Sequence, residues 1–387
     1  YLIPMLQNAG AIVFTPRERD WQKHEVIVDN DDAVKRPYYV ETVNGKKWKD
    51  CDSIGFAAKR RYYEDNQNPF TDGTVRKAKA TKKKNHSEIS YQPDLPEAGK
   101  YAVYVSYQSL PKSVTDAKYI VYHKGEATEF SVNQRMGGGT WVYLGTFDFD
   151  KGCNTLNRVV VTNQASKRGV VTSDAVRFGG GMGNILRGNN SSGMPRCLEG
   201  ARYYAQWAGA PYHVYGGRKG ANDYADDINT RSLMTNWLGG GSPYMPALQG
   251  KKVPIELSLA VHSDAGYNKD GKTTWGSLAI CTTNFNDGML NSGISRMTSK
   301  DLAKALLKNL VSDLRQQYGE FSERYLWDRN YSETRLPEVP AAIIETLSHQ
   351  SFPDMKIGQD PMGKFTIARS LYKTILRYVC TNHGLPY

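Results

Sequence analysis

The sequence predicts an α/β fold, with a mostly parallel sheet covered by helices on both faces, that carries an inserted all-β sandwich. Three observations support this prediction. Strand-like and helix-like patterns alternate at both ends of the chain, residues from about 36 to 180 show only strand-like patterns, and 387 residues are too many for one ordinary core. We therefore expect an α/β domain made of residues 1–35 and 181–387, with residues 36–180 as the insertion.

The N-terminal residues predict a helix followed by a strand. Leu2, Met5 and Leu6 have helical spacing, and Gly10 marks the end of the helix. The apolar run at residues 11–14 then predicts a buried strand. In a parallel sheet a strand should precede such a helix. We therefore expect a separate upstream segment to complete this unit.

The middle of the chain predicts an antiparallel sandwich. Its strand-like segments are separated by turn residues at the spacing that sandwiches show, and no helical period interrupts them. These segments are residues 100–107, 117–125, 128–134, 140–149, 157–164 and 174–180. The Gly, Asn and Ser-rich residues 181–196 predict a connector behind them.

The last part of the chain returns to alternating helices and strands. The clearest helix spans residues 299–319, with Ser299 as its cap, leucines at helical spacing and Gly319 at its end. Residues 200–217 predict a helix and then a strand. Further helices are predicted at 222–238 and 365–379, and strands at 254–262, 275–283 and 340–348. This alternation favours a sheet covered on both faces.

The charge of the chain favours an anionic partner. The formal charge is +11 and the pI is near 9.2, with basic runs at residues 59–61 and 76–84. A solvated loop is the alternative explanation of such runs. The sequence contains no nucleic-acid reader motif and no apolar run long enough for a bilayer, so we expect neither nucleic acid nor a membrane span.

Two ionisable residues stand at the carboxyl ends of predicted strands. His262 ends the strand 254–262, and Glu345 follows the apolar residues 341–344. Ligands of open α/β sheets bind beyond the carboxyl ends of the strands, where a zinc ligand and a general base would both be required. A polar residue that closes a strand remains the alternative for His262. A carboxylate at the depth of Glu345 requires a partner.

These residues lie in motifs that resemble the zinc-dependent N-acetylmuramoyl-L-alanine amidases. LSLAVHSDAG, with His262, is similar to the family's strand and zinc-ligand histidine, and PAAIIETLSHQS is similar to its later motif with the catalytic glutamate. LIPMLQNAGAIVFTPRERD resembles the early helix, strand and turn of the family. DDINTRSLMTNWL resembles its following helix, with Arg231 and Asn236 at matching positions.

The resemblance implies a Zn²⁺ ion held by two histidines and a glutamate, with water in the open position. Position by position, His262 matches a zinc ligand and Glu345 the catalytic glutamate, while the other ligands are expected upstream of Tyr1. The adjacent pair His24-Glu25 is an alternative source of ligands. Arg231 is at a matching position near the cleft, whereas Asp264 and His349 depart from the family's pattern. Asp264 would orient His262 or coordinate weakly, and His349 would line the cleft, with a core or loop position as its alternative.

The insertion has a resemblance of its own. GKYAVYVSY, YHKGEATEFSVNQ, GGTWVYLGTFDFDKG and SDAVRF resemble the golvesin C-terminal-like domain. The combined architecture resembles exported Bacteroidota surface proteins that carry the label xanthan lyase. That label does not by itself imply xanthan cleavage.

Two classes of function follow as hypotheses. The first is a zinc-dependent amide hydrolase that acts on peptidoglycan-like cell-wall material in the periplasm, at the cell surface or in the medium. The second is a surface protein that binds an anionic glycan without catalysis, or that is associated with a polysaccharide lyase. In the second class, exposed aromatic residues such as Trp141 would stack on sugars, although a core position is the alternative for Trp141.

Overall fold

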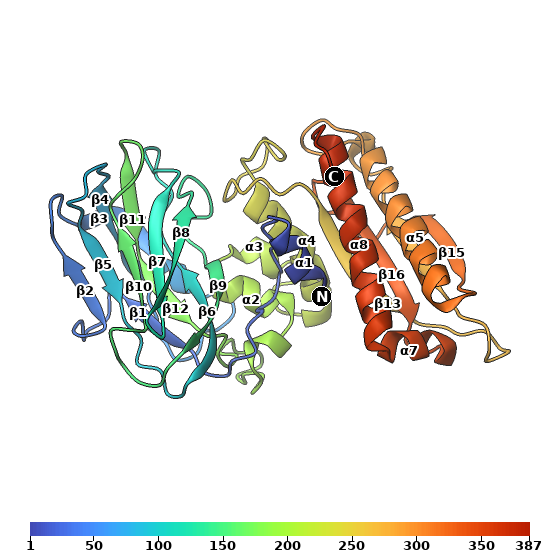
Figure 1. The fold of residues 1–387 in the computed structure, drawn as a ribbon, viewed down its shortest axis with the longest axis horizontal. Coiled ribbons are helices and arrows are strands. Elements are labelled where there is room, and N and C mark those ends of the chain that lie inside the picture. The colour runs from blue at the N-terminus through green and yellow to red at the C-terminus, as the bar shows by residue number, and fades with distance from the viewer. The chain divides into compact units, whose positions relative to one another are not determined.

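The computed structural model describes all 387 residues, and they form two compact units (Figure 1). The first unit consists of residues 1–14, 235–250 and 254–387, and the second of residues 15–234 and 251–253. The helix α4 (Asp223–Gly239) contributes residues to both units. The sequence pattern instead predicts boundaries at about residues 35 and 180, and those boundaries stay a prediction.

The second unit is built mainly from antiparallel strands. They are β1 (Val26–Asp29), β2 (Tyr39–Thr42), β3 (Lys49–Gly55), β4 (Gly73–Lys79), β5 (Glu88–Tyr91), β6 (Gly99–Val105), β7 (Ala117–His123), β8 (Glu126–Val132), β9 (Val142–Phe149), β10 (Arg158–Thr162), β11 (Val170–Ser173) and β12 (Ala175–Phe178). Their sheets have the orders β1-β12-β6-β9, β2-β5-β10-β7-β8 and β11-β4-β3. All six strands predicted for the sandwich are present, as β6 to β10 and β12.

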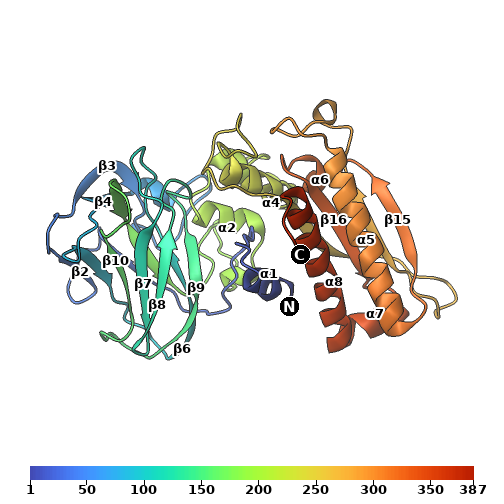
Figure 2. The same cartoon turned by 45° about the horizontal axis from the view of Figure 1, so that its top comes forward.

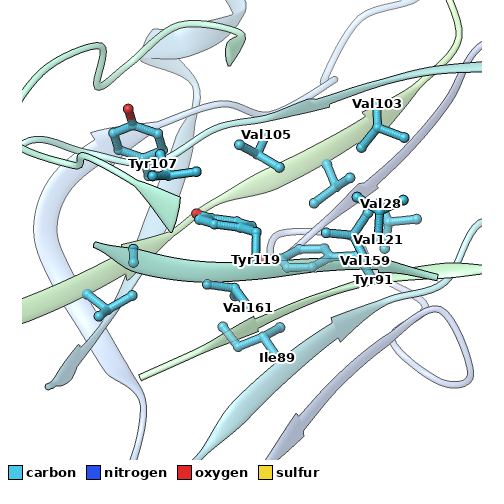
Figure 3. Close-up of a cluster of buried hydrophobic side chains, with 14 of the residues drawn as sticks. Val28, Ile89, Tyr91, Val103, Val105, Tyr107, Tyr119, Val121, Val159 and Val161 are labelled. Carbon is cyan, nitrogen blue, oxygen red and sulfur yellow. The ribbon is translucent and has the colours of Figure 1, made fainter. Parts of the chain in front are cut away.

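The strands of the second unit share one apolar core. Val103 and Val105 of β6 and Tyr119 and Val121 of β7 are fully buried members of the same cluster (Figure 3). Because β6 and β7 belong to different sheets, this cluster joins two sheets as the core of a sandwich does. The predicted all-β sandwich is therefore confirmed.

Helices follow the sandwich within the second unit. These are α2 (Ala201–Trp207), the short α3 (Tyr212–Tyr215) and the first part of α4. The prediction of a strand after α2 is wrong, because the chain forms the helical turn α3 there. Pro211 precedes this turn and Gly216 ends it. The apolar Val214 and Tyr215 are buried in this turn, so burial alone did not distinguish helix from strand.

The first unit is a mixed sheet with helices. Its elements are α1 (Leu2–Asn8), the end of α4, β13 (Ser258–Asp264), β14 (Ser277–Cys281), α5 (Met297–Tyr318), β15 (Glu323–Asp328), α6 (Ser332–Arg335), β16 (Ala341–Ser348), α7 (Phe352–Gln359) and α8 (Pro361–Asn382). The sheet has the order β13-β16-β14-β15. Two of its pairings are parallel and the pairing of β14 with β16 is antiparallel, which confirms a mostly parallel sheet.

Helices lie on both faces of this sheet, but a single turn is all that lies on one of them. The long helices α5 and α8 lie side by side across one face (Figures 1 and 2), where Leu306, Leu310 and Leu371 join Ala342 and Ile344 in one buried cluster. The single turn α6 packs on the opposite face. That face carries a smaller apolar cluster from β14 and β16, and it is the face of the candidate site.

Two predicted details of the first unit are wrong. Residues 11–14 form no strand, and Ile12 and Phe14 are exposed, because an apolar run makes a strand only where another strand offers hydrogen bonds. Ser299 does not cap α5, which begins at Met297; its hydroxyl instead accepts a hydrogen bond from the Ala341 N–H of β16. No helix in either unit has both the length and the apolar character that crossing a membrane requires.

Candidate functional site

The site lies where β13 and β16 run parallel. His262 of β13 and Glu345 of β16 occupy paired positions in the register of the two strands. Side chains at paired positions project from the same face of a sheet. Ala260 and Ile343, two residues before them, join the smaller apolar cluster, so His262 and Glu345 project from the face that carries α6. The structure thus brings the two predicted residues together. It places them within the strands and not at the carboxyl ends as predicted, because β13 continues to Asp264 and β16 to Ser348.

A second carboxylate completes the group. Glu333, on the single turn α6, places its Oε2 atom 3.0 Å from the Nε2 atom of His262, while the Oε1 atom of Glu345 lies 3.6 Å from Nδ1. The hydrogen bonds to Glu333 and then to Glu345 raise the pKa of His262 to about 9, although partial burial acts in the opposite direction. In the absence of a metal ion, the imidazole is therefore positively charged at neutral pH.

One oxygen of Glu345 has no protein partner. Its Oε2 atom is buried and accepts no hydrogen bond. Leaving a buried carboxylate oxygen unpaired costs free energy, and a water molecule or a substrate group with a proton to donate would remove that cost. The atom is therefore an acceptor that the protein itself leaves unused.

The residues present do not fit a complete zinc site. No three His, Cys, Asp or Glu side chains of the chain form a group that could hold a metal ion. Both ring nitrogens of His262 face carboxylate oxygens, whereas a zinc ligand directs one nitrogen lone pair at the metal. One imidazole and two carboxylates also differ from the two histidines and one glutamate that the resemblance implies.

Asp264 and His349 lie beyond His262 and have other partners. Asp264 forms an ion pair with Arg324 and accepts a hydrogen bond from the indole of Trp275. The Nδ1 atom of His349 lies 3.2 Å from both the hydroxyl and the carbonyl oxygen of Ser263. Thus the structure holds Asp264 through Arg324 and gives it no contact with the imidazole of His262.

His349 lines a cavity of about 320 Å³ on the other side of β13. Its walls are mostly apolar and include Val261, Leu347 and Leu371. Since Leu347 and Leu371 belong to the cluster beneath α5 and α8, this cavity is on the face opposite His262. Ser263 and His349 therefore belong to a different face from the candidate site.

The remaining predicted residues are in the second unit. Arg231 forms an ion pair with Asp227 at 3.1 Å along α4. His24 faces Glu97, and Glu25 binds Arg196 at 3.0 Å. His24 and Glu25 are thus engaged by separate partners.

Asn236 has a definite structural role near the site. Its side-chain amide donates to the Leu336 carbonyl at 2.8 Å and its oxygen accepts from the Glu338 N–H at 3.0 Å. These two bonds fix the connection between α6, which carries Glu333, and β16, which carries Glu345. Asn236 therefore helps to set the distance between the two carboxylates.

Sequence inspection missed Glu333. The segment that carries it, SETR, has no apolar period, and the helix is a single turn. The one available signal is that the segment connects directly to β16, so that its residues must lie near that strand. The contact between Glu333 and His262 is visible only in the tertiary structure.

Part of the β-sandwich matches a known domain family. Residues 63–180 match the family model described as the Golvesin C-terminal domain, which confirms the resemblance seen in the strand motifs. A curated xanthan lyase from Bacillus sp. (strain GL1) is 34% identical to this chain over 97 residues, which are 24% of this chain and 10% of the lyase. The chain thus spans about a tenth of the length of that relative.

Several solved structures overlap parts of the chain. A Paenibacillus xanthan lyase is 24% identical over 40% of this chain and 13% of its own, with a TM-score of 0.31. An N-acetylmuramoyl-L-alanine amidase from Clostridium difficile 630 is 18% identical over 32% of this chain and 58% of its own, with a TM-score of 0.25. The amidase Ami1 from Mycobacterium smegmatis is 15% identical over 42% of this chain and 65% of its own, with a TM-score of 0.29.

Proposed function

We propose that this chain carries the amide-hydrolysing site of an exported, zinc-dependent enzyme of the N-acetylmuramoyl-L-alanine amidase type, which acts on peptidoglycan-like cell-wall material. One observation supports this proposal above the others. His262 and Glu345 are paired within the parallel strands β13 and β16, and Glu345 keeps a buried oxygen without a partner. The bond to be cleaved would join a lactyl-bearing sugar to a peptide.

Glu345 would act as the general base and acid. Its unpartnered Oε2 atom would take the proton from the attacking water and then deliver it to the leaving amine. Glu333 and Glu345 hold His262 from two sides, which fixes the orientation of the ring. The polar groups of this step therefore come from β13, β16 and α6 alone.

The zinc part of the proposal depends on ligands outside the described residues. His262 is the ligand that this chain offers in the proposed site, and a separate upstream segment would supply the others. Binding of Zn²⁺ would require His262 to release its proton. Zinc content measured on this chain combined with the proposed upstream segment tests this, with about one zinc per molecule expected and none in a His262→Gln variant.

Turnover tests the role of Glu345. In this chain combined with the upstream segment and Zn²⁺, Glu345→Gln should lower kcat for release of peptide from purified peptidoglycan by about 10²–10⁴-fold while binding persists. Glu323→Gln is the matched control, since Glu323 is an exposed residue of β15. Undiminished turnover in Glu345→Gln would remove Glu345 from the mechanism.

A second candidate function is glycan binding without catalysis. The match of residues 63–180 to the Golvesin C-terminal domain and the likeness to a xanthan lyase favour it. Stacking of sugars on Trp141 does not, because Trp141 is 5% exposed and packs against Phe56 and Phe70. Binding of polysaccharides by a protein that turns over neither peptidoglycan nor xanthan would favour this candidate, and formation of unsaturated sugars from xanthan would indicate a lyase.

A further inference from the structure

One end of the sandwich gathers cations from three loops and the strands beside them. We name this surface the lysine-rich end. It consists of eight lysines and one arginine, all exposed: Lys46, Lys47, Lys49, Lys79, Lys82, Lys83, Lys84, Lys167 and Arg168. The basic run 76–84 supplies only part of it, so the surface is a product of the fold rather than of one stretch of sequence.

Buried hydrogen bonds hold the three loops together. The Asn44 N–H donates to the Ser87 hydroxyl, and the Ser87 N–H donates to the side-chain oxygen of Asn163 at 2.8 Å. The Thr81 N–H donates to the Asn163 carbonyl at 2.9 Å. Ser87 and Asn163 are both fully buried. The loops that carry Lys46, Lys82 to Lys84 and Lys167 are therefore fixed as neighbours.

The charges of this surface form no ion pairs within the protein, and Asp116, which accepts a hydrogen bond from the Ser166 N–H, is the carboxylate held in the loop of Lys167. None of its nine side chains takes part in an ion pair with a carboxylate. The exposed carboxylates of β3, Asp50 and Asp52, bind Arg76 and Lys77 of β4 instead. Lys49 of β3 also stands directly opposite Lys77, and like charges at such positions destabilise a sheet.

We propose that the lysine-rich end binds a linear acidic polysaccharide through its carboxylate groups. Lysines are flexible point charges that adapt to anionic groups spaced along a polymer, whereas the arginine fork suits two parallel hydrogen bonds to a single carboxylate or phosphate group. Eight of the nine cations are lysines. The surface thus fits a polymer whose anionic groups are separately spaced, as the carboxylates of an acidic polysaccharide are.

The composition of the loops also disfavours a single-stranded nucleic acid. Recognition of unpaired bases uses exposed aromatic rings for stacking. Residues 43–47, 79–87 and 163–169 contain no Phe, Tyr or Trp, and Trp48 beside them is buried. The interaction is therefore electrostatic, and it weakens as salt screens the charges.

Binding of the whole chain to polygalacturonate, measured by calorimetry at low and at high salt, tests the proposal. Fully methyl-esterified polygalacturonate is the matched polymer without charge. We expect Lys83→Glu/Lys84→Glu to weaken binding about tenfold or more, because each reversal replaces an attraction by a repulsion. Lys46→Glu/Lys47→Glu, from a different loop, should have a similar effect.

The control reverses the same number of charges at the other end of the same sheet. Lys124 and Lys151 lie beside the residues that precede β10, whereas Asn163 follows it. Lys124→Glu/Lys151→Glu should bind as tightly as the wild type. Equal loss in the control, equal binding of the esterified polymer, or tight binding of a DNA duplex with none of polygalacturonate would each overturn the proposal. The readout is independent of amide hydrolysis, so failure of the proposed function leaves it intact.

Discussion

His262 and Glu345 occupy directly paired positions on the parallel strands β13 and β16, and their side chains lie 3.6 Å apart between Nδ1 and Oε1. Parallel register places both at the same level of one sheet face. Glu333 approaches the same imidazole from α6, closer than Glu345 does. The imidazole therefore lies between two carboxylates, and its pKa depends on both of them.

The titration of His262 in the metal-free protein is the first prediction. Its pKa should be about 9, as an NMR titration of the histidine ring protons measures, with His262→Gln identifying the signal. Glu333→Gln should lower this pKa more than Glu345→Gln, since the contact of Glu333 is the shorter one. A pKa near the ordinary histidine value would contradict the geometry.

The raised pKa of His262 should make the stability of the folded protein depend on pH. The charged imidazole gains its carboxylate partners only on folding, so its pKa is higher in the folded chain. Its stabilising contribution is fully present below about pH 6.5 and is lost as the pH rises through about 9. In metal-free protein, the difference in unfolding temperature between the wild type and His262→Gln should shrink across that interval.

The fold of the first unit was largely predictable where periodicity is strong. The leucines of α5 and the apolar run before Glu345 specify a helix and a buried strand, and both are present. β15 was missed because ERYLWD mixes charged and aromatic residues, and an edge strand buries little. Its pairing with β14 depends on contacts that a local pattern does not contain.

The site was predictable only in part, for a related reason. The apolar residues before His262 and Glu345 predict the two strands, but both residues lie within β13 and β16 and not beyond their carboxyl ends. Glu333 and Asn236 act through the connection between α6 and β16, whose path is set by tertiary packing. The buried Arg177 likewise gave no signal in the sequence, because its position on β12 looks like an ordinary exposed strand residue.

Asn236 should influence His262 from a distance. Asn236→Ala removes both hydrogen bonds to the connection before β16, so Glu333 should be held less firmly and the pKa of His262 should fall. The free energy of unfolding should fall by about 2 kcal/mol. Asn309→Ala removes a hydrogen bond between α5 and α8, on the opposite face, and should leave the titration of His262 unchanged. Equal titration curves in the wild type and Asn236→Ala would contradict this role.

Asp174 should make the second unit less stable at higher pH. Complete burial raises the pKa of Asp174 to about 7, and burial together with Asp174 raises that of Asp29 well above its usual range. The folded chain therefore keeps a proton that the unfolded chain loses. The resulting contribution is fully present below about pH 4 and is lost as the pH rises through about 7.

Calorimetric unfolding between pH 4 and pH 8 checks this prediction. Asp174→Asn should reduce the pH dependence, because an amide carries no charge and still accepts the hydrogen bonds from the Phe56 N–H and the Ser106 hydroxyl. Asp94→Asn, at an exposed position, is the control. The same slope in the wild type and in Asp174→Asn would show that Asp174 is not the group that titrates.

The buried ion pair between Glu18 and Arg177 should be the most sensitive polar contact of the second unit. Both side chains are fully buried and their charged atoms lie 2.7 Å apart. Glu18→Gln removes one of the negative charges that offset the buried guanidinium of Arg177, although Glu25 remains 3.4 Å away. We expect the free energy of unfolding in urea to fall by about 3 kcal/mol.

An exposed ion pair provides the comparison. Lys100 and Asp148 pair at 3.2 Å on β6 and β9, with both side chains more than half exposed. Asp148→Asn should cost less than about 1 kcal/mol, since water screens the pair. Adding Arg177→Met to Glu18→Gln should recover part of the loss, because it removes the uncompensated charge. If the double variant were no more stable than Glu18→Gln, the loss would come from the backbone amides of Arg19 and Asp20, which also donate to Glu18.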